Sequence, residues 1–254
     1  MAEDVRVEVS DRIGIITMNR PDARNAVNTS MSKGVAAAVD DLVARDDVTV
    51  IILTGAGGTF CAGMDLKAFA GGERPAIPGR GLAGITEAGV GKPLIAAVEG
   101  YALAGGFELA LAADIIVASR TAVFGFPEVA RGLVASGGGL LRIAKVMPLG
   151  AAMDVVLTGS RFDAEAAHGY GLVTRLTEPG DALAGAVALG RQIAANAPLA
   201  VRLSKEILAG AVRWVDPEMY AWQRSVAEPS FTSEDAKEGV RAFAEKRPPV
   251  WTGR

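Results

Sequence analysis

Short apolar runs with strand character alternate with helical segments through the first 178 residues, and this rhythm constrains the fold more than any other feature. Alternating apolar residues over Val5–Val9 and Ile13–Met18 predict a β-hairpin. The β-branched run Val48–Leu53 and the later run Leu94–Val98 predict buried strands. Apolar residues at helical spacing over Met31–Val43 predict a helix between the hairpin and the strand Val48–Leu53. Strands that alternate with helices in this way are typical of an α/β core.

The rest of the chain continues this pattern and then gives way to helices. Further strands are predicted at Ile115–Ala118, Ala122–Phe124 and Leu172–Leu176, and further helices at Ala104–Ala113, from Pro127, from Leu140, and over 150–157 and 163–168. From Gly180 onward the spacing is helical, and Thr232 or Ser233 is placed to cap the last helix. We expect an α/β core over residues 1–195 and a helical C-terminal region over 196–254 whose apolar stripes serve oligomerisation.

Composition excludes several classes of function. The chain has one cysteine and one histidine, so it forms neither an intramolecular disulfide nor a Cys-based zinc cluster, and it lacks an acidic calcium loop. No metal site is therefore expected. The formal net charge of −3 gives no global basic field for nucleic acid. The charged N-terminus lacks an apolar signal core, and no apolar run reaches the roughly 18 residues of a membrane span, so we expect a cytoplasmic protein without membrane insertion.

Tyr101–Ala113 is one of the most apolar stretches of the chain, and Glu108 is its only charged residue. A buried carboxylate must be paired, protonated or used in chemistry, because an isolated buried charge is costly. Gly105 precedes Glu108 by three residues, so an unused backbone N–H group and the carboxylate share one helical turn. A second carboxylate, Glu128, follows Pro127 in the first turn of another predicted helix, where it could also serve only as a cap. If the two glutamates face each other across a cleft, one becomes an acid and the other a base.

Glycine-rich turns supply the other site candidates. Residues 57–67, GGTFCAGMDLK, place a turn after a buried strand and before a helix whose first N–H groups are unused. A dinucleotide fingerprint is rejected because Phe60 occupies the position of its third glycine. Cys61 and His168 are not predicted to form a catalytic dyad, since nothing in the sequence brings them together. The Gly- and Pro-rich segment 71–91 is expected to be a mobile loop that lines or covers a site.

Together, these segments resemble the crotonase superfamily, the enoyl-CoA hydratase/isomerase proteins. The matching stretches run in family order from residue 19 to the C-terminus and are NRPDARNAV, FCAGMDLK, AAVEGYALAGGFELALAADIIVAS, FGFPEVARGLVASGGGLLR, LTGSRFDAEAAHGYGLV and EGVRAFAEKRPPVWTGR. The resemblance implies a spiral of ββα units with a helical C-terminal region, assembled as a homotrimer or a dimer of trimers. It also implies a CoA thioester as ligand and no cofactor, because CoA is part of the substrate.

The resemblance assigns roles to residues as well. It places the thioester oxygen between the backbone N–H groups of Met64 and Gly105, an oxyanion hole. Both glutamate positions of the hydratase members are filled, by Glu108 and Glu128. By resemblance Glu128 supplies the C2 proton and Glu108 holds and activates water, a division that the residues alone leave open. The expected contacts to the pantetheine path and the CoA adenosine end are Arg24, Ala26, Ala62, Met64, Asp65, Leu66, Lys67 and Gly105, with Arg24 and Lys67 meeting phosphate.

Retention of both glutamates favours an enoyl-CoA hydratase, which adds water across the C2=C3 bond of a trans-2-enoyl-CoA to give a 3-hydroxyacyl-CoA. Two alternatives stay open. One is another crotonase reaction, such as Δ3,Δ2-enoyl-CoA isomerisation or dehydration of a polar acyl-CoA, and the other is a non-catalytic acyl-CoA-binding protein. Met64 replaces a small residue, and residues 135–139 read ASGGG where well-known hydratases have PGAGG, so the acyl group stays open.

Overall fold

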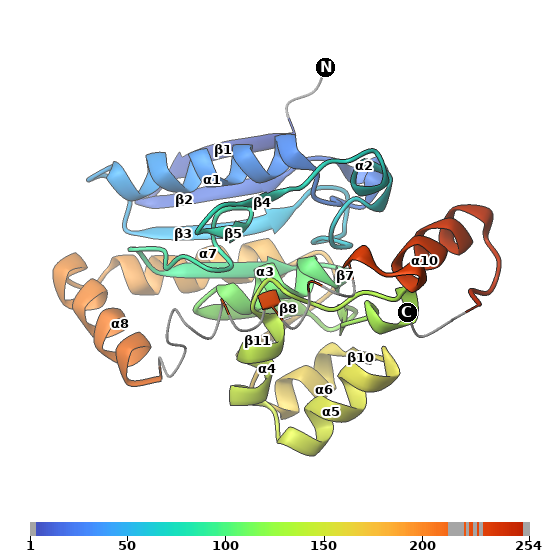
Figure 1. Ribbon diagram of the computed structural model, residues 1–254. Helices are drawn as coiled ribbons and strands as arrows, with labels where there is room; N and C mark the ends of the chain where they lie inside the picture. The colour runs from blue at the N-terminus through green and yellow to red at the C-terminus, as the bar shows by residue number, and fades with distance from the viewer. Residues whose placement is uncertain (1–3, 213–220, 222–223, 226–227, 229–230, 251–254) are drawn as a thin grey trace.

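A six-stranded sheet with helices on both faces forms the centre of the molecule (Figure 1). The computed structural model describes residues 4–212, 221, 224–225, 228 and 231–250. The strands lie in the order β1, β2, β3, β6, β8, β11, in which β1 and β2 are antiparallel and the other neighbours are parallel. The predicted hairpin and α/β core are confirmed. The bounds of the six strands are Val5–Ser10, Ile13–Met18, Val50–Gly55, Leu94–Val98, Ile115–Ser119 and Arg175–Thr177.

Alternate side chains of the central strands face two different hydrophobic layers. In β3, Ile51 packs in the layer that contains α1 (Thr29–Ala44), whereas Ile52 packs in the layer that contains α7 (Ala182–Ala194). Both faces exclude water, which explains why this strand reads as a continuous apolar run. Helix α7 therefore belongs to the sheet core, and the helical extension predicted from Gly180 begins only after it.

A second sheet of three strands holds segments that carry the site. It pairs β10 (Arg161–Asp163), β9 (Val123–Gly125) and β7 (Tyr101–Leu103) in that order. Helix α3 (Gly105–Ala112) begins two residues after β7, so β6, β7 and α3 form one ββα unit. Strands β8 and β9 followed by α4 (Gly139–Val146) form the next unit. This succession confirms the expected spiral of ββα units.

One predicted helix is much shorter than expected. The segment from Pro127 is a single 3₁₀ turn, η2 (Val129–Arg131), with Glu128 at its N-cap. Gly132 adopts a left-handed φ of 66° and ends the turn there. Glu128 is therefore held at a tight bend and not in the first turn of an α-helix.

Two further local predictions are corrected. The strand predicted over Leu172–Leu176 begins later, at Arg175, and is β11. Leu172 and Val173 do not join the sheet, because both of their N–H groups donate hydrogen bonds to Ala167 O. The segment 71–91, predicted to be a mobile loop, contains the short hairpin of β4 and β5 and buries Ile85 in the core. It is anchored to the body of the protein. The two hairpin strands are Ala76–Ile77 and Gly81–Leu82.

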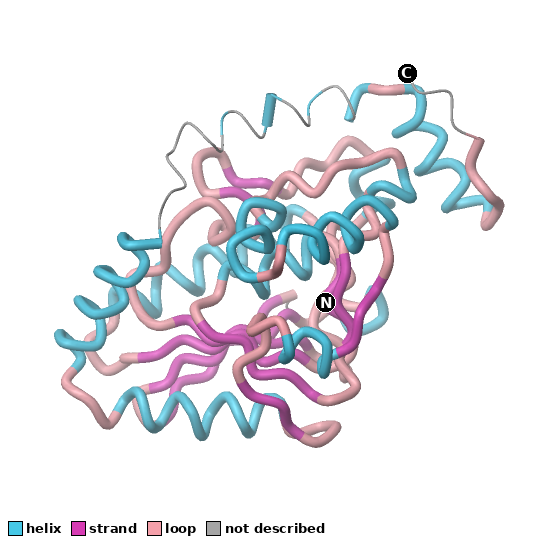
Figure 2. Tube along the Cα trace, turned by 90° about the horizontal axis from the view of Figure 1, so that it is seen from below, coloured by secondary structure: helices cyan, strands magenta, loops and turns pink. Residues whose placement is uncertain are grey.

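Two C-terminal helices, α8 (Pro198–Val212) and α10 (Glu234–Glu245), lie at opposite ends of the molecule (Figure 1 and Figure 2). Ser233 caps α10 by accepting a hydrogen bond from Ala236 N at 2.9 Å, which confirms one of the two predicted caps. A Cβ on Gly239 of α10 would lie 2.1 Å from Arg131 O, so this helix packs directly against η2. Residues 213–220, also predicted to be helical, lie outside the described residues. The other helices described are η1 (Pro21–Ala23), α2 (Leu66–Ala70), α5 (Leu149–Thr158) and α6 (Ala164–Gly169).

A search of the described helices for membrane spans finds none that is both long and apolar enough to cross a bilayer.

Candidate active site

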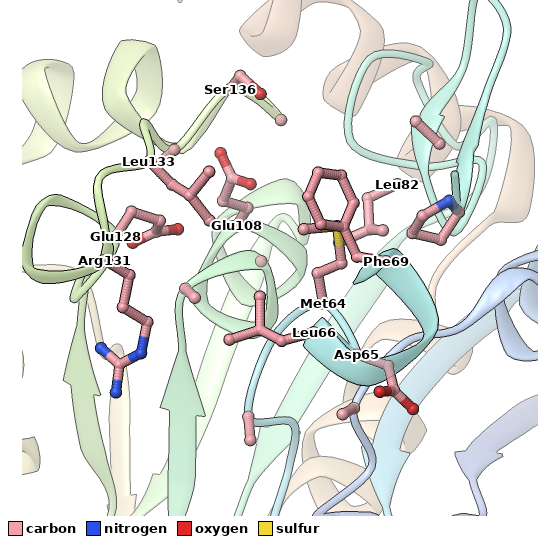
Figure 3. Close-up of a pocket in the computed structure, with 18 of the residues that line it drawn as sticks. Met64, Asp65, Leu66, Phe69, Leu82, Glu108, Glu128, Arg131, Leu133 and Ser136 are labelled. Atoms are coloured by element: carbon pink, nitrogen blue, oxygen red, sulfur yellow. The ribbon is translucent and has the colours of Figure 1, made fainter. Parts of the chain in front are cut away.

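A pocket with a volume of about 1210 Å³ brings together every residue that the sequence assigned to the site. Figure 3 shows the side chains of Glu108, Glu128 and Met64 around the same cavity, although they come from three separate segments. The pocket is lined by all of the predicted residues, which are Arg24, Ala26, Ala62, Met64, Asp65, Leu66, Lys67, Gly105, Glu108 and Glu128.

Two left-handed turns place the backbone N–H groups of Met64 and Gly105 side by side. Gly63 has a φ of 106° and Ala104 a φ of 52°. A Cβ on Gly105 would lie 3.6 Å from Met64 N. The Ala104 N–H donates to Gly125 O at 3.0 Å and holds the second turn in place. Within the described chain neither Met64 N nor Gly105 N donates a backbone hydrogen bond, so this pair suits an oxygen that develops negative charge.

Cys61 forms hydrogen bonds with the turn before Met64 and with the strand that precedes Gly105. Its thiol donates to Asn25 O at 3.1 Å and accepts a hydrogen bond from Gly63 N at 3.4 Å. Its N–H donates to Tyr101 O at 2.8 Å, and its carbonyl accepts from Leu103 N at 3.0 Å. Burial raises the pKa of the thiol to about 12, so it stays protonated and serves as a structural link.

Glu108 lies in the first turn of α3 and is only 5% exposed. Its Oε1 accepts a hydrogen bond from Gly139 N at 3.0 Å. A Cβ on Gly137 would lie 2.6 Å from Oε2, and a Cβ on Gly139 would lie 2.7 Å from Cγ, so both glycines make room for this side chain. Burial raises the pKa of Glu108 to about 7, against the opposing effect of the two glycine N–H groups and of the Arg142 charge.

Glu128 reaches the same cavity from the N-cap of η2. Its Oε2 is buried and has no hydrogen-bond partner among the described residues. Burial, and after it the charge of Glu108, raise the pKa of Glu128 to about 8. Near neutral pH Glu128 therefore mainly keeps its proton while Glu108 titrates. An acid and a base in one cavity can move two protons in one reaction.

The other predicted contacts differ in what their side chains do. The Arg24 guanidinium lies over the ring of Tyr101, 5.8 Å from its centroid. Lys67 is an exposed residue of the pocket. Asp65 lines the pocket, and its carboxylate caps α2 and pairs with Arg20 at 3.0 Å, which holds this part of the pocket wall.

Several pocket residues were not predicted. The Gly- and Pro-rich composition of 71–91 indicated a segment that lines a site, but no signal singled out Leu82 or Glu87 within it. The sequence offered one signal for Arg131, because it stands three residues after Glu128 and could therefore lie near the same pocket. The unpredicted lining residues with large side chains include Phe69, Arg74, Leu82, Glu87, Arg131, Leu133, Arg161, Arg224, Phe231 and Phe243.

The geometry of the described residues supports neither a metal site nor a Cys61–His168 dyad. Across the residues that the structure describes, no group of three or more His, Cys, Asp or Glu side chains is arranged to hold a metal ion. The Nδ1 of His168 is hydrogen-bonded to Val173 O at 2.8 Å, whereas the Cys61 thiol is bonded to Asn25 O. These two residues thus have separate partners and form no dyad.

The chain is similar to hydratases and dehydratases of CoA thioesters along its whole length. A family model described as enoyl-CoA hydratase/isomerase matches residues 8–254. The carnitinyl-CoA dehydratase of Salmonella arizonae is 44% identical, with 100% of both chains covered. The structure of a carnitinyl-CoA hydratase from Mycobacterium avium is 42% identical and superposes with a TM-score of 0.95 over 100% of both chains. The enoyl-CoA hydratase from Mycobacterium tuberculosis H37Rv is 57% identical, with a TM-score of 0.81 over 99% of this chain and 100% of that chain.

Proposed function

Because the chain belongs to the enoyl-CoA hydratase/isomerase family of the crotonase superfamily, whose similar members are acyl-CoA hydratases and dehydratases, we propose that it is an enoyl-CoA hydratase. The proposed reaction adds water across the C2=C3 bond of a trans-2-enoyl-CoA and gives a 3-hydroxyacyl-CoA. The observation that carries the proposal is the pair of carboxyl groups with raised pKa values, Glu108 and Glu128, in one cavity with two unused N–H donors.

The thioester carbonyl would sit between Met64 N and Gly105 N. Addition at C3 pushes electrons onto this oxygen, which becomes an enolate. Each donor aimed at such an oxygen is worth about 2.7–4 kcal/mol of transition-state stabilisation. Because the donors are backbone groups fixed by the turns at Gly63 and Ala104, they need no reorganisation during the reaction.

Glu108 is the base in this proposal. It is held by the Gly139 N–H, and in its ionised form it removes a proton from water while the water oxygen bonds to C3. Glu128 is the acid, and it donates its proton to C2 as the enolate collapses. The product gains one oxygen and two hydrogens, and one proton must pass from Glu108 to Glu128 before the next turnover. Water and the thioester suffice for this sequence, so no cofactor is proposed.

A second candidate is the reverse reaction on a polar substrate, the dehydration of a 3-hydroxyacyl-CoA whose acyl group carries a positive charge. Glu87 is the residue that bears on it, because this carboxylate lines the pocket with its side chain only 12% exposed, and it would have to exchange its partner Arg224 for the positive charge of the substrate. Phe69 and Phe231 also line the pocket, with ring centroids 6.3 Å apart, and aromatic faces attract cations. Several similar proteins are named carnitinyl-CoA dehydratase.

The test is turnover of crotonyl-CoA by the purified protein, followed as loss of the enoyl-thioester absorbance with identification of the product by mass. Formation of 3-hydroxybutyryl-CoA supports the hydratase. The second candidate is tested with a 3-hydroxyacyl-CoA that carries a quaternary ammonium group, for which Glu87→Gln would lower kcat/KM while crotonyl-CoA turnover stays unchanged. Binding of CoA thioesters without turnover across longer, branched and polar acyl groups would establish the non-catalytic alternative.

The exposed leucines of α8 support an oligomeric assembly. Leu199, Leu203 and Leu208 are all exposed on this helix. We propose that residues 196–254 hold a homotrimer or a dimer of trimers together, that residues 1–195 form the catalytic core, and that the protein works in the cytoplasm without nucleic acid or membrane insertion. Light scattering at micromolar concentration tests the assembly, and a monomer would contradict it.

A further inference from the structure

The terminal motif EGVRAFAEKR, residues 238–247, includes no residue that the proposed reaction uses. It comprises most of α10 and the bend that follows this helix. Lys246 ends α10 with a left-handed φ of 53°, and the chain then returns along the helix, since Val250 N donates to Glu238 Oε1 at 2.9 Å. The motif thus folds back on itself.

Glu238 is the centre of this folded-back segment and is only 7% exposed. Besides Val250 N, its carboxylate accepts hydrogen bonds from both Nη atoms of Arg247, at 2.6 Å and 3.0 Å, and from Nε of Arg241 at 3.1 Å. Arg247 above all, and then the Val250 N–H, holds the pKa of Glu238 well below its usual range. Glu238 therefore stays ionised and closes the last two turns of α10.

Two glycines bring α10 directly against η2. A Cβ on Gly239 of α10 would lie 2.1 Å from Arg131 O, and a Cβ on Gly132, just after η2, would lie 2.7 Å from Asp235 O. Both contacts are with backbone atoms, so a side chain at either position would force the helix and the turn apart. Glycine at these positions lets α10 touch the turn that has Glu128 at its N-cap.

Arg131 links the same helix to the residues on both sides of Glu128. Its guanidinium carbon lies 5.2 Å from the ring centroid of Phe243, on α10, where the aromatic face attracts the cation. Its Nη1 donates to Pro127 O at 3.3 Å, and its N–H donates to Glu128 O at 2.8 Å. One side chain on the turn thus contacts α10 and the residue that precedes Glu128.

The Glu128 carboxyl group depends on this turn for its position. Its buried Oε2 has no hydrogen-bond partner among the described residues, whereas Oε1 of Glu108 is held by Gly139 N. A proton donor that is misplaced by about 1 Å costs about 10²-fold in rate. What fixes η2 therefore also fixes the rate of the step in which Glu128 gives up its proton.

We propose that α10 positions the proton donor of the reaction: Glu238 and Gly239 hold η2 in place, and η2 holds the Glu128 carboxyl group in the pocket. This assignment rests on the proposed function, since it takes Glu128 to be the acid that protonates C2. Neither Glu238 nor Gly239 lines the pocket, so both are positioning residues that act through η2 and not by contact with the substrate.

The first test is a double-mutant cycle on the hydration of crotonyl-CoA. Gly239→Ala, which forces α10 away from η2, and Glu238→Gln, which removes the charge that holds Arg247, are each made with and without Glu128→Gln. We expect kcat to fall about 10²-fold in Gly239→Ala and about tenfold in Glu238→Gln. In the Glu128→Gln background neither change should lower kcat further, because both act through the same carboxyl group.

The second test follows the proton of Glu128 without turnover. The infrared band of its protonated carboxyl group, identified by its absence in Glu128→Gln, is titrated in the unliganded protein. Burial, and after it the charge of Glu108 on α3, raises the pKa of Glu128 to about 8, against the opposing charge of Arg131 on η2. If η2 moves, water reaches the carboxyl group, and the midpoint should fall from about pH 8 toward the ordinary range of a glutamate in both variants.

Lys237→Gln is the matched control on the same helix. Lys237 is exposed and pairs with Glu234 at 2.6 Å, so its replacement removes an ion pair of α10 and leaves Glu238 and the contact with η2 in place. This variant should keep the parental kcat and the parental midpoint. If Gly239→Ala does not fold, Glu238→Gln decides the test, because it replaces the carboxylate by an amide of nearly the same volume.

Two results would overturn the assignment. One is a parental kcat with a parental titration midpoint in the folded variants. The other is an equal loss of kcat with and without Glu128→Gln, which would give α10 a structural role only. A parent protein that turns over no acyl-CoA would contradict the proposed function instead, and the titration would still decide whether α10 holds Glu128 in the pocket.

Discussion

Glu108 and Glu128 carry their carboxyl groups into one cavity, and the charge of Glu108 raises the pKa of Glu128. Glu108 nevertheless keeps the lower of the two values, because the N–H groups of Gly139 and Gly137 favour its ionised form. Glu128 has no such donors at Oε2. In the proposed mechanism, the backbone N–H groups around Glu108 favour this residue as the base and leave Glu128 as the acid.

The first prediction concerns the pH dependence of kcat/KM, which reports the groups of the unliganded enzyme. The active form has Glu108 ionised and Glu128 protonated, so the rate should rise as pH passes about 7 and fall as it passes about 8. We expect a bell-shaped profile with its maximum between the two values, at about pH 7 to 8. A profile that stays flat from about pH 6 to about pH 9 would show that this pair does not control the reaction.

The same pKa values predict that the fold is less stable in alkaline solution. Glu128 has a higher pKa when folded than when unfolded, so the unfolded state releases its proton first as pH rises above about 4.5. The free energy of unfolding should fall between about pH 5 and pH 8.5. Glu128→Gln should remove part of this slope and be more stable than the parent at pH 8.5 by about 1–3 kcal/mol. Urea unfolding at about pH 5 and about pH 8.5 measures the free energy of unfolding of each protein. Glu8→Gln, at an exposed position, is the control. The same pH dependence of this free energy in Glu128→Gln and in the parent would refute the prediction.

Gly137→Ala should impair catalysis through Glu108. The new Cβ would lie 2.6 Å from Oε2 of Glu108 and must push the carboxylate aside. A misplacement of about 1 Å costs about 10²-fold in rate, so we expect a fall of that size in kcat. Gly150→Ala is the matched control, since its Cβ meets nothing within 4 Å in α5. The control should retain full activity and gain about 0.5–1 kcal/mol of stability from helix propensity; parental kcat in Gly137→Ala would remove the steric argument.

Cys61→Ala should weaken the oxyanion hole without changing substrate affinity. It removes the hydrogen bond that the thiol accepts from Gly63 N, next to Met64. We expect kcat to drop about tenfold with KM unchanged, and Cys61→Ser to recover much of the loss because a hydroxyl donates and accepts in the same place. The carbonyl stretching frequency of a bound CoA thioester should move toward its value in water in the alanine variant alone. An unchanged frequency in that variant would assign the thiol a packing role only.

The positions of most main-sheet strands along the chain could be anticipated because long β-branched runs and helical spacing are local signals, whereas their order in the sheet could not. Strands β7 and β10 were missed for a physical reason: three residues are too few to show a period, and their pairing depends on neighbours distant in the chain. The strained turn at Ala104 was equally invisible, since a left-handed φ of 52° is unusual for a residue that is not glycine.

For the site as well, some features could be predicted from the sequence and others could not. Motif resemblance placed Met64, Gly105 and both glutamates in one pocket, where the structure also places them. Whether an arginine forms an ion pair cannot be read from the sequence, because Arg20 pairs with Asp65, 45 positions away, while Arg131 lies three residues after Glu128 and forms no ion pair among the described residues. The ion pair of Asp65 with Arg20 was invisible in the sequence for the same reason.

The most direct test is conversion of crotonyl-CoA in ¹⁸O-labelled water by the parent, Glu108→Gln and Glu128→Gln, with the product analysed by mass. The parent should form 3-hydroxybutyryl-CoA that carries one labelled oxygen, and each variant should be slower by about 10²–10⁴-fold, because removal of a general acid or base costs that much. A parent product without the label, or a Glu108→Gln variant that keeps most of the activity while Glu128→Gln loses it, would contradict a two-carboxylate hydratase and indicate single-glutamate isomerisation.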